Sequence, residues 1–517
     1  MSPAWRADPK GINMKIGLIG HIVPAPLALI PTSMERWGYK YTRVETEGAS
    51  MIDHIAYLKR QLGLPRHESF SVWEMNLASG LLLRSRLKES GNEVLTVNYI
   101  DSDNEDQEFA RIKEFAPDIL ALSTTFILSP SQLNYVARLI RKHLPDAFVV
   151  AGGQHISTEL ASLNDKQQRA YLKTTGLDGF INDAQGEASL VKLTQLYPAR
   201  LAEVPNLIWR QPSGEVVINP RQAEANDLDS VIDLSGIHEG SVVHLRTARG
   251  CAFKCSFCSY PASGGTWSLA NVESAIAQLR LAREAGAGAV IFTDDTFNVP
   301  QKRFNHLLDR MIEAGINLPW YSFLRCQFVD AALVEKMRRS GCRGVLLGIE
   351  SGADSVLSNM NKGSKVEHYR RGVRWLKNAG ITSVGSFLIG FPGETAETIT
   401  QTEEFISDAG LDFFYLQLFY YLHHAPVHHV ASKFGLTGRG LLWSHATMDW
   451  QEASARLDQI FRKHGSRCLH QDYNLWEIAF LENRGFDRDR IIQYRSMINR
   501  MALAKLDSMP DAGKSTE

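Results

Sequence analysis

Residues 249–258 read Arg-Gly-Cys-Ala-Phe-Lys-Cys-Ser-Phe-Cys, and this stretch constrains the fold and the chemistry of the whole chain. Its cysteines, Cys251, Cys255 and Cys258, are separated by three residues and then by two. Three thiolates on one short loop can ligate three irons of an iron–sulfur cube, which leaves the fourth iron open to a small molecule. A structural zinc site is the alternative, but zinc sites usually close with four ligands in two pairs, and no partner pair is present.

The composition around this motif is that of a globular protein. The chain has 517 residues, of which 44% are hydrophobic and 22% are charged. These values exclude a disordered chain, a fibrous repeat and a disulfide-rich mini-protein. The formal net charge of −1 provides no basic excess for binding nucleic acid or an anionic membrane.

The cysteine distribution and the N-terminus predict where the protein works. The first 250 residues contain no cysteine, so the six cysteines do not form a spread disulfide framework. The N-terminus lacks a basic-then-apolar signal pattern, and no apolar run reaches about 18 residues. We therefore expect a cytoplasmic protein that acts on a small molecule, with neither nucleic acid nor a membrane as partner.

The cysteine motif follows the first of six predicted strand–helix units in residues 241–430. The predicted strands are Val242–Arg246, Ala289–Thr293, Tyr321–Leu324, Gly344–Ile349, Ser383–Ile389 and Phe413–Leu418. The helices predicted between them are Val272–Ala285, Lys302–Ala314, Ala331–Ser340, Val366–Ala379 and Ala396–Asp408. Six such units predict a partial barrel, short of the eight in a closed one. Residues 431–517 are expected to form a helical region with a polar tail.

Residues 14–200 also alternate between strand and helix patterns. Strands are predicted at Lys15–Gly20, Glu93–Tyr99, Asp118–Ser123, Phe148–Ala151 and Asp178–Ile181. Helices are predicted at Ser71–Glu89, Glu105–Phe115, Pro130–His143 and Glu187–Leu196. This pattern predicts an α/β domain of the Rossmann-like type, in which helices cover both faces of an open parallel sheet. In residues 201–240, Pro205, Pro212 and Pro220 disfavour helices, and this segment is predicted to form a hairpin and linker with a turn at Ser213–Gly214.

The cysteine spacing, with Phe257 just before the third cysteine, is similar to the signature of radical S-adenosylmethionine (SAM) enzymes. The resemblance implies a [4Fe–4S] cluster on Cys251, Cys255 and Cys258, with SAM bound through its amino and carboxylate groups to the open iron. It also implies that reduction of the cluster, by a donor such as flavodoxin or ferredoxin, cleaves SAM to a 5′-deoxyadenosyl radical.

Further motifs resemble this family at the ends of the predicted barrel strands, where barrels place their active sites. They are FTDDTF at 292–297, Arg325, GIESG at 348–352 and GFPGET at 390–395. The resemblance implies that Asp295, Arg325 and Glu350 contact SAM and that the backbone of Phe257 contacts its adenine. Alternatively, Asp294 and Asp295 cap the following helix.

An α/β domain ahead of such a barrel resembles the cobalamin-dependent members of the family. The resemblance implies that strand-end loops surround the nucleotide tail of cobalamin, through hydroxyl groups, closely approached glycine backbone and a Gly-Glu pair. The residues concerned are Ser123, Thr124, Thr125, Gly152, Gly153, Gly186 and Glu187. A plain Rossmann-like domain with ordinary helix caps is the alternative.

The histidine-ligated cobalamin motif D-x-H-x-x-G is absent, since His54 directly follows Asp53 and His155 follows a glycine pair. No imidazole is therefore expected on the lower face of the cobalt, which fits members of this family that bind cobalamin without one. Trp73 could cover that face, but we favour a role in the core.

The segment 420–450 contains the histidines His423, His424, His428, His429 and His445. Their spacing matches no metal motif, so we expect surface positions or a wall of the substrate site. Cys326 is expected to be an inert buried cysteine. Together with HATMDW at 445–450 and SVWEMNLASGLLLRSRLKESG at 71–91, the segment resembles the branch of the P-methyltransferase of phosphinothricin biosynthesis.

These resemblances predict a methyltransferase that uses a 5′-deoxyadenosyl radical and methylcobalamin to methylate an unactivated carbon or a phosphinate phosphorus. Such centres lack a nucleophilic lone pair, which explains the need for two cofactors. A radical rearrangement or cyclisation with the same cofactors is an alternative, and a non-catalytic cobalamin sensor is another. A methylthiotransferase is disfavoured because its N-terminal domain carries three more cysteines.

Overall fold

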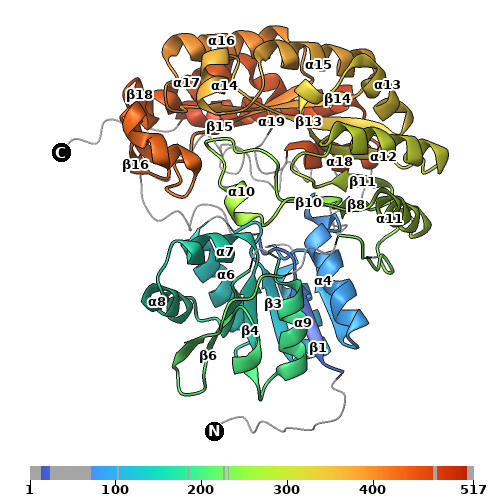
Figure 1. Cartoon of the computed structure of the whole chain (residues 1–517), viewed down its shortest axis with the longest axis vertical. Coiled ribbons are helices and arrows are strands. Elements are labelled where there is room, and N and C mark those ends of the chain that lie inside the picture. The colour runs from blue at the N-terminus through green and yellow to red at the C-terminus, as the bar shows by residue number, and fades with distance from the viewer. Residues whose placement is uncertain are drawn as a thin grey trace. The chain divides into compact units, whose positions relative to one another are not determined.

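The computed structural model describes residues 13–23, 72–101, 104–127, 129–183, 185–224, 228–230, 232–469 and 474–508. The chain divides into two compact units. The first contains the described residues of 1–29, 73–235 and 262–266, and the second contains chiefly those of 236–261 and 267–517 (Figure 1).

The first unit is built on a seven-stranded sheet with the order β2-β1-β3-β4-β5-β6-β7. The strands are β1 (Lys15–Ile19), β2 (Glu93–Val97), β3 (Ile119–Ser123), β4 (Val149–Gly152), β5 (Gly179–Ile181), β6 (Leu207–Arg210) and β7 (Val216–Ile218). The first five are parallel, which confirms the predicted α/β sheet. The last two form a hairpin that pairs antiparallel with β5 and extends the sheet.

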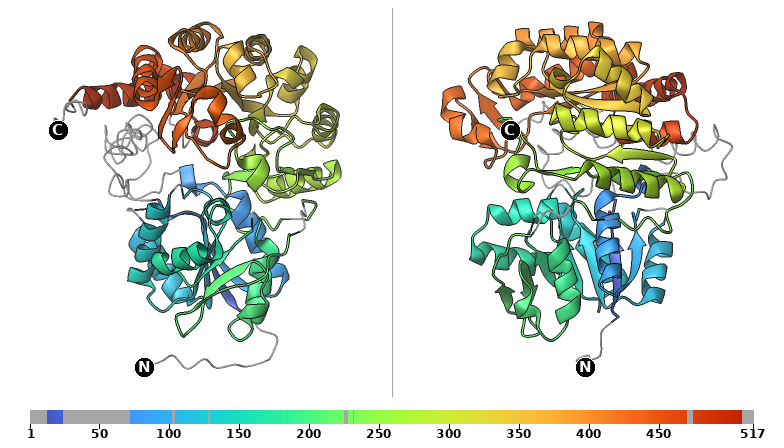
Figure 2. Two further views of the ribbon diagram at one scale, coloured as in Figure 1. Left: turned by 60° about the vertical axis from the view of Figure 1, so that its left-hand side comes forward. Right: turned by 45° about the vertical axis from the view of Figure 1, so that its right-hand side comes forward.

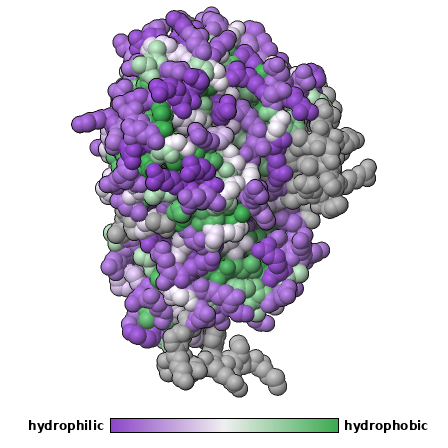
Figure 3. Space-filling model, turned by 90° about the vertical axis from the view of Figure 1, so that its right-hand side faces the viewer, coloured by the Kyte–Doolittle hydropathy of each residue, from purple (hydrophilic) through white to green (hydrophobic). Residues whose placement is uncertain are grey.

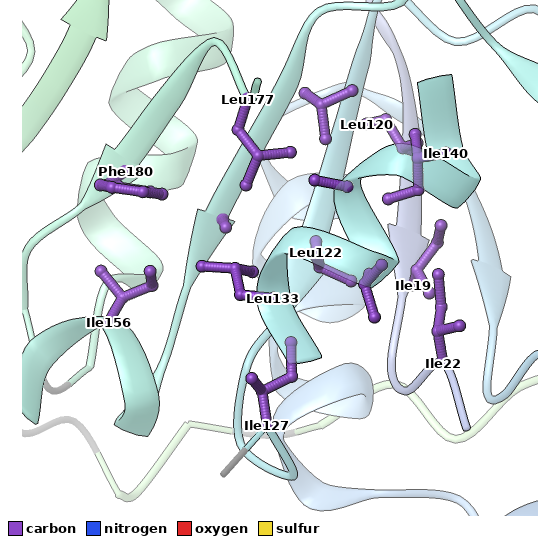
Figure 4. Close-up of a cluster of buried hydrophobic side chains, with 14 of the residues drawn as sticks. Ile19, Ile22, Leu120, Leu122, Ile127, Leu133, Ile140, Ile156, Leu177 and Phe180 are labelled. Carbon is purple, nitrogen blue, oxygen red and sulfur yellow. The ribbon is translucent and has the colours of Figure 1, made fainter. Parts of the chain in front are cut away.

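Helices cover both faces of this sheet because successive residues of a strand point to opposite sides. Leu120 and Leu122 of β3 belong to one buried cluster, shown in Figure 4, and Ile119 and Ala121 belong to another. The first cluster is completed by α5 (Glu105–Phe115), α6 (Pro130–His143), α7 (Gln154–Ala161) and α8 (Asp165–Thr175). The second is completed by α4 (Ala78–Glu89) and α9 (Glu187–Leu196).

Helix α4 begins later than the sequence pattern predicts. A short 3₁₀ turn, η1 (Val72–Glu74), comes first, and Leu77 has an extended backbone with φ −70° and ψ 136°. Leu77 is nevertheless buried. The helical spacing of apolar residues therefore extends to positions before α4, and this makes the predicted helix longer than the observed one. Ser71, the predicted first residue, lies outside the described residues.

The second unit contains a six-stranded, all-parallel sheet with the order β15-β14-β13-β12-β11-β8. Its strands are β8 (Val242–Leu245), β11 (Ala289–Phe292), β12 (Trp320–Leu324), β13 (Cys342–Glu350), β14 (Thr382–Ile389) and β15 (Phe413–Leu418). The connecting helices are α11 (Val272–Glu284), α12 (Gln301–Glu313), α13 (Ala331–Arg339), α14 (Asp354–Asn359), α15 (Val366–Asn378) and α16 (Ala396–Asp408). Figures 1 and 2 show these helices along the outer side of the curved sheet. Because β8 and β15 are not paired with each other, the predicted partial barrel is confirmed.

The C-terminal region is mostly helical, as expected, but it also contains a small antiparallel sheet. After η4 (Pro426–Phe434) come β16 (Thr437–Arg439), β17 (Leu442–His445), β18 (Met448–Asp449), α17 (Trp450–His464), α18 (Asn474–Asn483) and α19 (Arg488–Ser508). Helix α18 packs against β8, β11 and β13. The hydroxyl of Tyr321 in β12 donates to a carboxylate oxygen of Glu482 in α18 at 2.6 Å, which fixes this helix against the sheet.

The described surface is predominantly polar. Most side chains on the face drawn in Figure 3 are hydrophilic, and Tyr420 and Val430 are the large hydrophobic residues found exposed among those described. Within the described helices, none combines the length and the apolar character that crossing a bilayer requires.

We expect Gly20→Ala to destabilise the first unit. A Cβ atom at Gly20, directly after β1, would lie 2.6 Å from the backbone oxygen of Asn98, so the backbone itself must shift. Such overpacking typically costs about 1–3 kcal/mol. A matched control is Gly80→Ala in α4, where nothing lies within 4 Å of the added atom and alanine favours the helix. Thermal unfolding should show a lower midpoint for the first variant and an equal or higher midpoint for the second; equal losses in both would contradict the close-approach role of Gly20.

Candidate cofactor site

The three cysteines of the motif lie on an irregular loop between β9 (Ala248–Arg249) and α10 (Tyr260–Ser263), just past β8. Cys255 is buried, Cys251 and Cys258 are half-buried, and all three are free thiols. They are not among the groups of described residues close enough to share a single metal ion. In an iron–sulfur cluster, each of the three thiolates would bind a different iron.

The loop is fixed mainly through Ser256, a residue that no sequence motif marks. Its peptide N–H donates to the carbonyl of Met360 at 2.8 Å, and its hydroxyl donates to the carbonyl of Asn359 at 2.8 Å. Its own carbonyl accepts from the peptide N–H of Val427 at 2.8 Å. Two segments that are distant in sequence therefore hold the cysteine loop. No pattern in the sequence signals this role, because the residue between two cysteines is not restricted by metal ligation.

Burial keeps the thiols of Cys251 and Cys258 protonated in the absence of metal. It raises the pKa of Cys258 to about 11 and the pKa of Cys251 above its usual value. Because a metal binds the thiolate, loading the loop must release protons, and cluster binding is expected to strengthen as pH rises.

The two adjacent aspartates after β11 have different surroundings. Asp294 is fully buried, and its carboxylate accepts from the peptide N–H and the hydroxyl of Thr247 at 2.6 and 2.5 Å. It therefore ties the segment after β8 to the end of β11. Asp295 is exposed, is hydrogen-bonded to Tyr260 and lies near Arg246. Of the two, Asp295 has the carboxylate that a ligand can reach, and no helix-cap bond is found for either among the described residues.

Glu350 ends β13 with an unusual backbone. Its φ of +70° is rare for a residue with a side chain, and the pairing of β13 with β14 shifts register beside it. The carboxylate is buried and accepts from the ammonium of Lys362 at 2.8 Å and from the hydroxyl of Ser386 at 3.4 Å. A Cβ atom at Gly348 would approach both the Glu350 carboxylate and the Lys362 ammonium to 3.0 Å or less. The first glycine of GIESG therefore makes room for this ion pair, whose lysine is not predicted from the sequence.

Arg325, at the end of β12, contacts the cysteine loop directly. One guanidinium nitrogen, Nη2, donates to Sγ of Cys255 at 3.3 Å, and Nη1 donates to the carbonyl of Lys362 at 3.1 Å. Its Cζ lies 3.5 Å from the ring centroid of Phe253. Phe257 is half-buried, and the Lys362 ammonium lies 5.5 Å from its ring centroid. The structure thus brings Arg325, Glu350 and Phe257 together around the cysteine loop.

Glu394 of the GFPGET segment lies inside the protein. Its side chain is fully buried, and one oxygen accepts from the peptide N–H of Gly390 at 2.5 Å. The other oxygen has no hydrogen-bond partner among the described residues. Burial raises the pKa of Glu394 to about 8, so this carboxyl is mostly protonated at pH 7 and stabilises the loop after β14 as a neutral group.

In the first unit, the predicted cobalamin residues lie beyond the carboxyl ends of β3, β4 and β5. The sheet order reverses between β1 and β3, and ligands of open α/β sheets bind outside the strand ends at such a point. Ser123 is half-buried and Thr125 is exposed, with their hydroxyls 3.1 Å apart. Thr124 is fully buried, and its hydroxyl joins the carbonyl of Gly152 to the peptide N–H of Ile156. Thr124 therefore has a structural role, and its two neighbours offer the accessible hydroxyls.

Two glycines of this region, Gly153 and Gly186, have a positive φ. Gly153 has φ +109°, a backbone conformation that residues with a side chain rarely adopt, so this position favours glycine. A Cβ atom there would lie 3.4–3.5 Å from atoms of Thr124 and Thr125, which is an ordinary contact distance. Gly186 precedes α9 with φ +73°, and Glu187 is the first residue of that helix. At this helix end, the Glu224 carboxylate accepts hydrogen bonds from the peptide N–H groups of Ala188 and Ser189 at 2.8 Å each.

Aromatic residues pack at the end of β1. Trp73 is buried, its ring centroid lies 4.4 Å from that of His21 and 4.7 Å from that of Phe126, and this arrangement is the core role favoured for it. Burial lowers the pKa of His21 to about 3, so this histidine is neutral. His155 is buried and bonded to the hydroxyl of Tyr171 at 3.0 Å. Asp53 and His54 lie outside the described residues.

The C-terminal histidines form no metal group among the described residues. His428 bonds to the hydroxyl of Tyr421 at 2.7 Å, and the ring centroids of His423 and His428 are 4.7 Å apart. His445 is buried and bonds to the carbonyl of Gly390 at 3.3 Å. Cys326 is also buried, as expected.

Comparison with known proteins finds a family match within the second unit. A model of the Radical SAM superfamily matches residues 245–406, so this segment is a radical SAM domain, as the cysteine motif predicts. Over 338 residues the chain is 28% identical to an uncharacterized methyltransferase of Pyrococcus horikoshii, covering 61% of this chain and 71% of that protein. Over 347 residues it is 25% identical to the anaerobic magnesium-protoporphyrin IX monomethyl ester cyclase of Rubrivivax gelatinosus, covering 63% and 61% of the two.

The fold of most of the chain is that of a solved methyltransferase. The radical S-adenosylmethionine methyltransferase TsrM from Kitasatospora setae, solved with cobalamin and a [4Fe-4S] cluster bound, superimposes with a TM-score of 0.61. The match covers 83% of this chain and 96% of that one at 19% identity, which shows a shared fold.

We expect Glu394→Gln to remove a pH dependence of stability. The carboxyl has a folded pKa of about 8 against an ordinary value of 4.5, so between these values the native state holds a proton that the unfolded state has released. Stability therefore falls as pH rises through this window, by roughly 1.4 kcal/mol per pH unit. Between pH 5.5 and 7.5, the free energy of unfolding should fall less steeply with pH for Glu394→Gln than for wild type. The exposed Glu397→Gln is the charge-matched control, and parallel curves for all three proteins would refute the assignment.

Proposed function

Because residues 245–406 are a radical SAM domain, we propose that the chain is a cobalamin-dependent radical SAM methyltransferase acting on a small molecule. The methyl acceptor would be an unactivated carbon or a phosphinate phosphorus. The observation that carries the proposal is the loop of three free thiols beyond the carboxyl end of a six-stranded parallel sheet. That edge of a barrel is where catalytic groups gather.

The residues of the second unit fit a cluster with SAM beside it. Cys251, Cys255 and Cys258 would hold three irons, and Ser256 keeps their loop in place. When bound, the cluster would supply the electron that cleaves SAM, received from a donor such as flavodoxin or ferredoxin, and cobalamin would supply the methyl group. Asp295 and the Glu350–Lys362 pair offer a carboxylate and a fixed ion pair on the same edge of the sheet for the charged groups of SAM.

The first unit is proposed to bind cobalamin. Its support is the strand order 2-1-3-4-5, with a switch point between β1 and β3, and the fold shared with a cobalamin-containing methyltransferase. Ser123 and Thr125 would bond the nucleotide tail, and Gly153 would allow close approach of the ring system. We assign cobalamin binding to residues 14–200 and SAM cleavage to residues 241–430.

A cyclisation or rearrangement with the same cofactors is the second candidate. It is favoured by the 25% identity to an anaerobic cyclase over 63% of this chain. A cofactor sensor without catalysis is the remaining alternative, and the intact cysteine loop argues against it.

Cys255→Ala should abolish cluster binding without unfolding the protein, because the three hydrogen bonds of Ser256 still hold the loop when the bond from Arg325 to the thiol is lost. Anaerobically reconstituted wild type should contain about four irons and absorb as an iron–sulfur protein. The matched control is Cys342→Ala, a buried cysteine at the start of β13, whose iron content should equal that of wild type. An unchanged iron content in Cys255→Ala would exclude the cluster.

The two enzymatic candidates differ in how they consume SAM. Wild type supplied anaerobically with hydroxocobalamin, SAM and a low-potential reductant should form both S-adenosylhomocysteine and 5′-deoxyadenosine, even as slow uncoupled products. Omitting cobalamin should stop the first product, and Cys255→Ala should stop the second. Formation of 5′-deoxyadenosine alone would favour the cyclase-type reaction, and formation of neither would favour the sensor.

A further inference from the structure

Within the described part of the chain, Arg325 carries a positive charge that no carboxylate balances. Among those residues it has no ion-pair partner, whereas the neighbouring Lys362 is paired with Glu350 at 2.8 Å. The Cys255 thiol can become negative, and its Sγ accepts a hydrogen bond from Arg325 Nη2 at 3.3 Å. The counter-charge of this guanidinium is therefore a cluster ligand.

The guanidinium is also held rigidly. The peptide N–H of Arg325 donates to the Asn298 side chain at 3.0 Å, and its carbonyl accepts from the same side chain at 2.9 Å. Nη1 of Arg325 donates to the carbonyl of Lys362, and the guanidinium carbon Cζ lies 3.5 Å from the ring centroid of Phe253. A planar group held at its backbone, face and edge keeps its charge at a fixed distance from the sulfur.

A fixed positive charge beside a thiolate ligand acts on the redox state of the metal group. When a [4Fe–4S] cluster takes one electron from an external reductant, it gains one negative charge and no bond changes. Hydrogen bonds to the sulfurs and nearby cations stabilise the reduced form more than the oxidised form. They therefore raise the reduction potential and make the electron easier to accept.

We propose that Arg325 raises the reduction potential of the cluster held by Cys251, Cys255 and Cys258, through its hydrogen bond to the Cys255 sulfur. The inference rests on the proposed function only in requiring a cluster. It differs from the contact with SAM that the family resemblance implies, because it assigns Arg325 a role that is present before SAM binds.

The test is a redox titration of the reconstituted cluster without SAM, followed by electron paramagnetic resonance with dithionite as reductant. We expect Arg325→Met to decrease the ratio of reduced to oxidised cluster about tenfold at a fixed potential, a shift of about 59 mV for one electron. Arg325→Lys keeps the charge but loses the planar fork, so its potential should lie between the two. Arg310→Met is the matched control, since Arg310 pairs with Glu273 and Glu313 on the surface, and its potential should equal that of wild type.

Equal potentials for wild type and Arg325→Met, both with full iron content, would overturn the inference while leaving the proposed function intact. If Arg325→Met loses iron, Arg325→Lys decides, and a wild-type potential in that variant would also overturn it. If neither variant assembles a cluster, Arg325 builds the loop and does not tune it, which overturns the inference as well. A wild-type protein that binds no cluster would instead refute the proposed function.

Discussion

The site depends on how an irregular loop is held in place. Residues 251–258 have no strand or helix of their own, so their shape comes from hydrogen bonds with other parts of the chain. Ser256 is bonded to the C-terminal end of α14 and to Val427 in η4, and Arg325 reaches the loop from the end of β12. Each contact comes from the carboxyl side of the parallel sheet. The barrel therefore acts as a frame that brings separate strand ends to one loop, which is the usual way in which such folds build sites.

The motifs predicted from the sequence divide, in the structure, into accessible side chains and buried side chains that support them. In FTDDTF, Asp294 fixes the backbone while Asp295 stays accessible. In the Ser-Thr-Thr segment, Thr124 is buried, while Ser123 is half-buried and Thr125 is exposed. Glu394 serves as a buried neutral acceptor for its own loop. A single motif thus contains accessible side chains that can react or bind and buried side chains that hold the backbone. The burial and the hydrogen-bond partners of each residue distinguish these two roles.

Much of this fold can be predicted from residue patterns, because parallel strands buried on both faces are short apolar runs and the helices between them are amphipathic. The cysteine spacing also predicts a metal site. Lys362 and Ser256 could not be found in this way, since they lie in a connecting segment and between two ligands, where no periodicity applies. The predicted start of α4 is wrong because Leu77 is buried in an extended segment that keeps helical spacing. The antiparallel hairpin is predictable from its turn, but its place in the first sheet depends on long-range pairing with β5.

The bond between Ser256 and Val427 has a consequence for biogenesis. The ribosome makes the cysteine loop early, but the backbone group that closes its support emerges only after β15 has been completed. Until then the three thiols lie on a segment that lacks one of its anchors, and long-range contacts of this kind form late in folding. If metal were delivered to this loop during synthesis, the loop would still lack the hydrogen bond from Val427. The order of events that the connectivity favours is therefore synthesis beyond Val427 first and metal insertion afterwards.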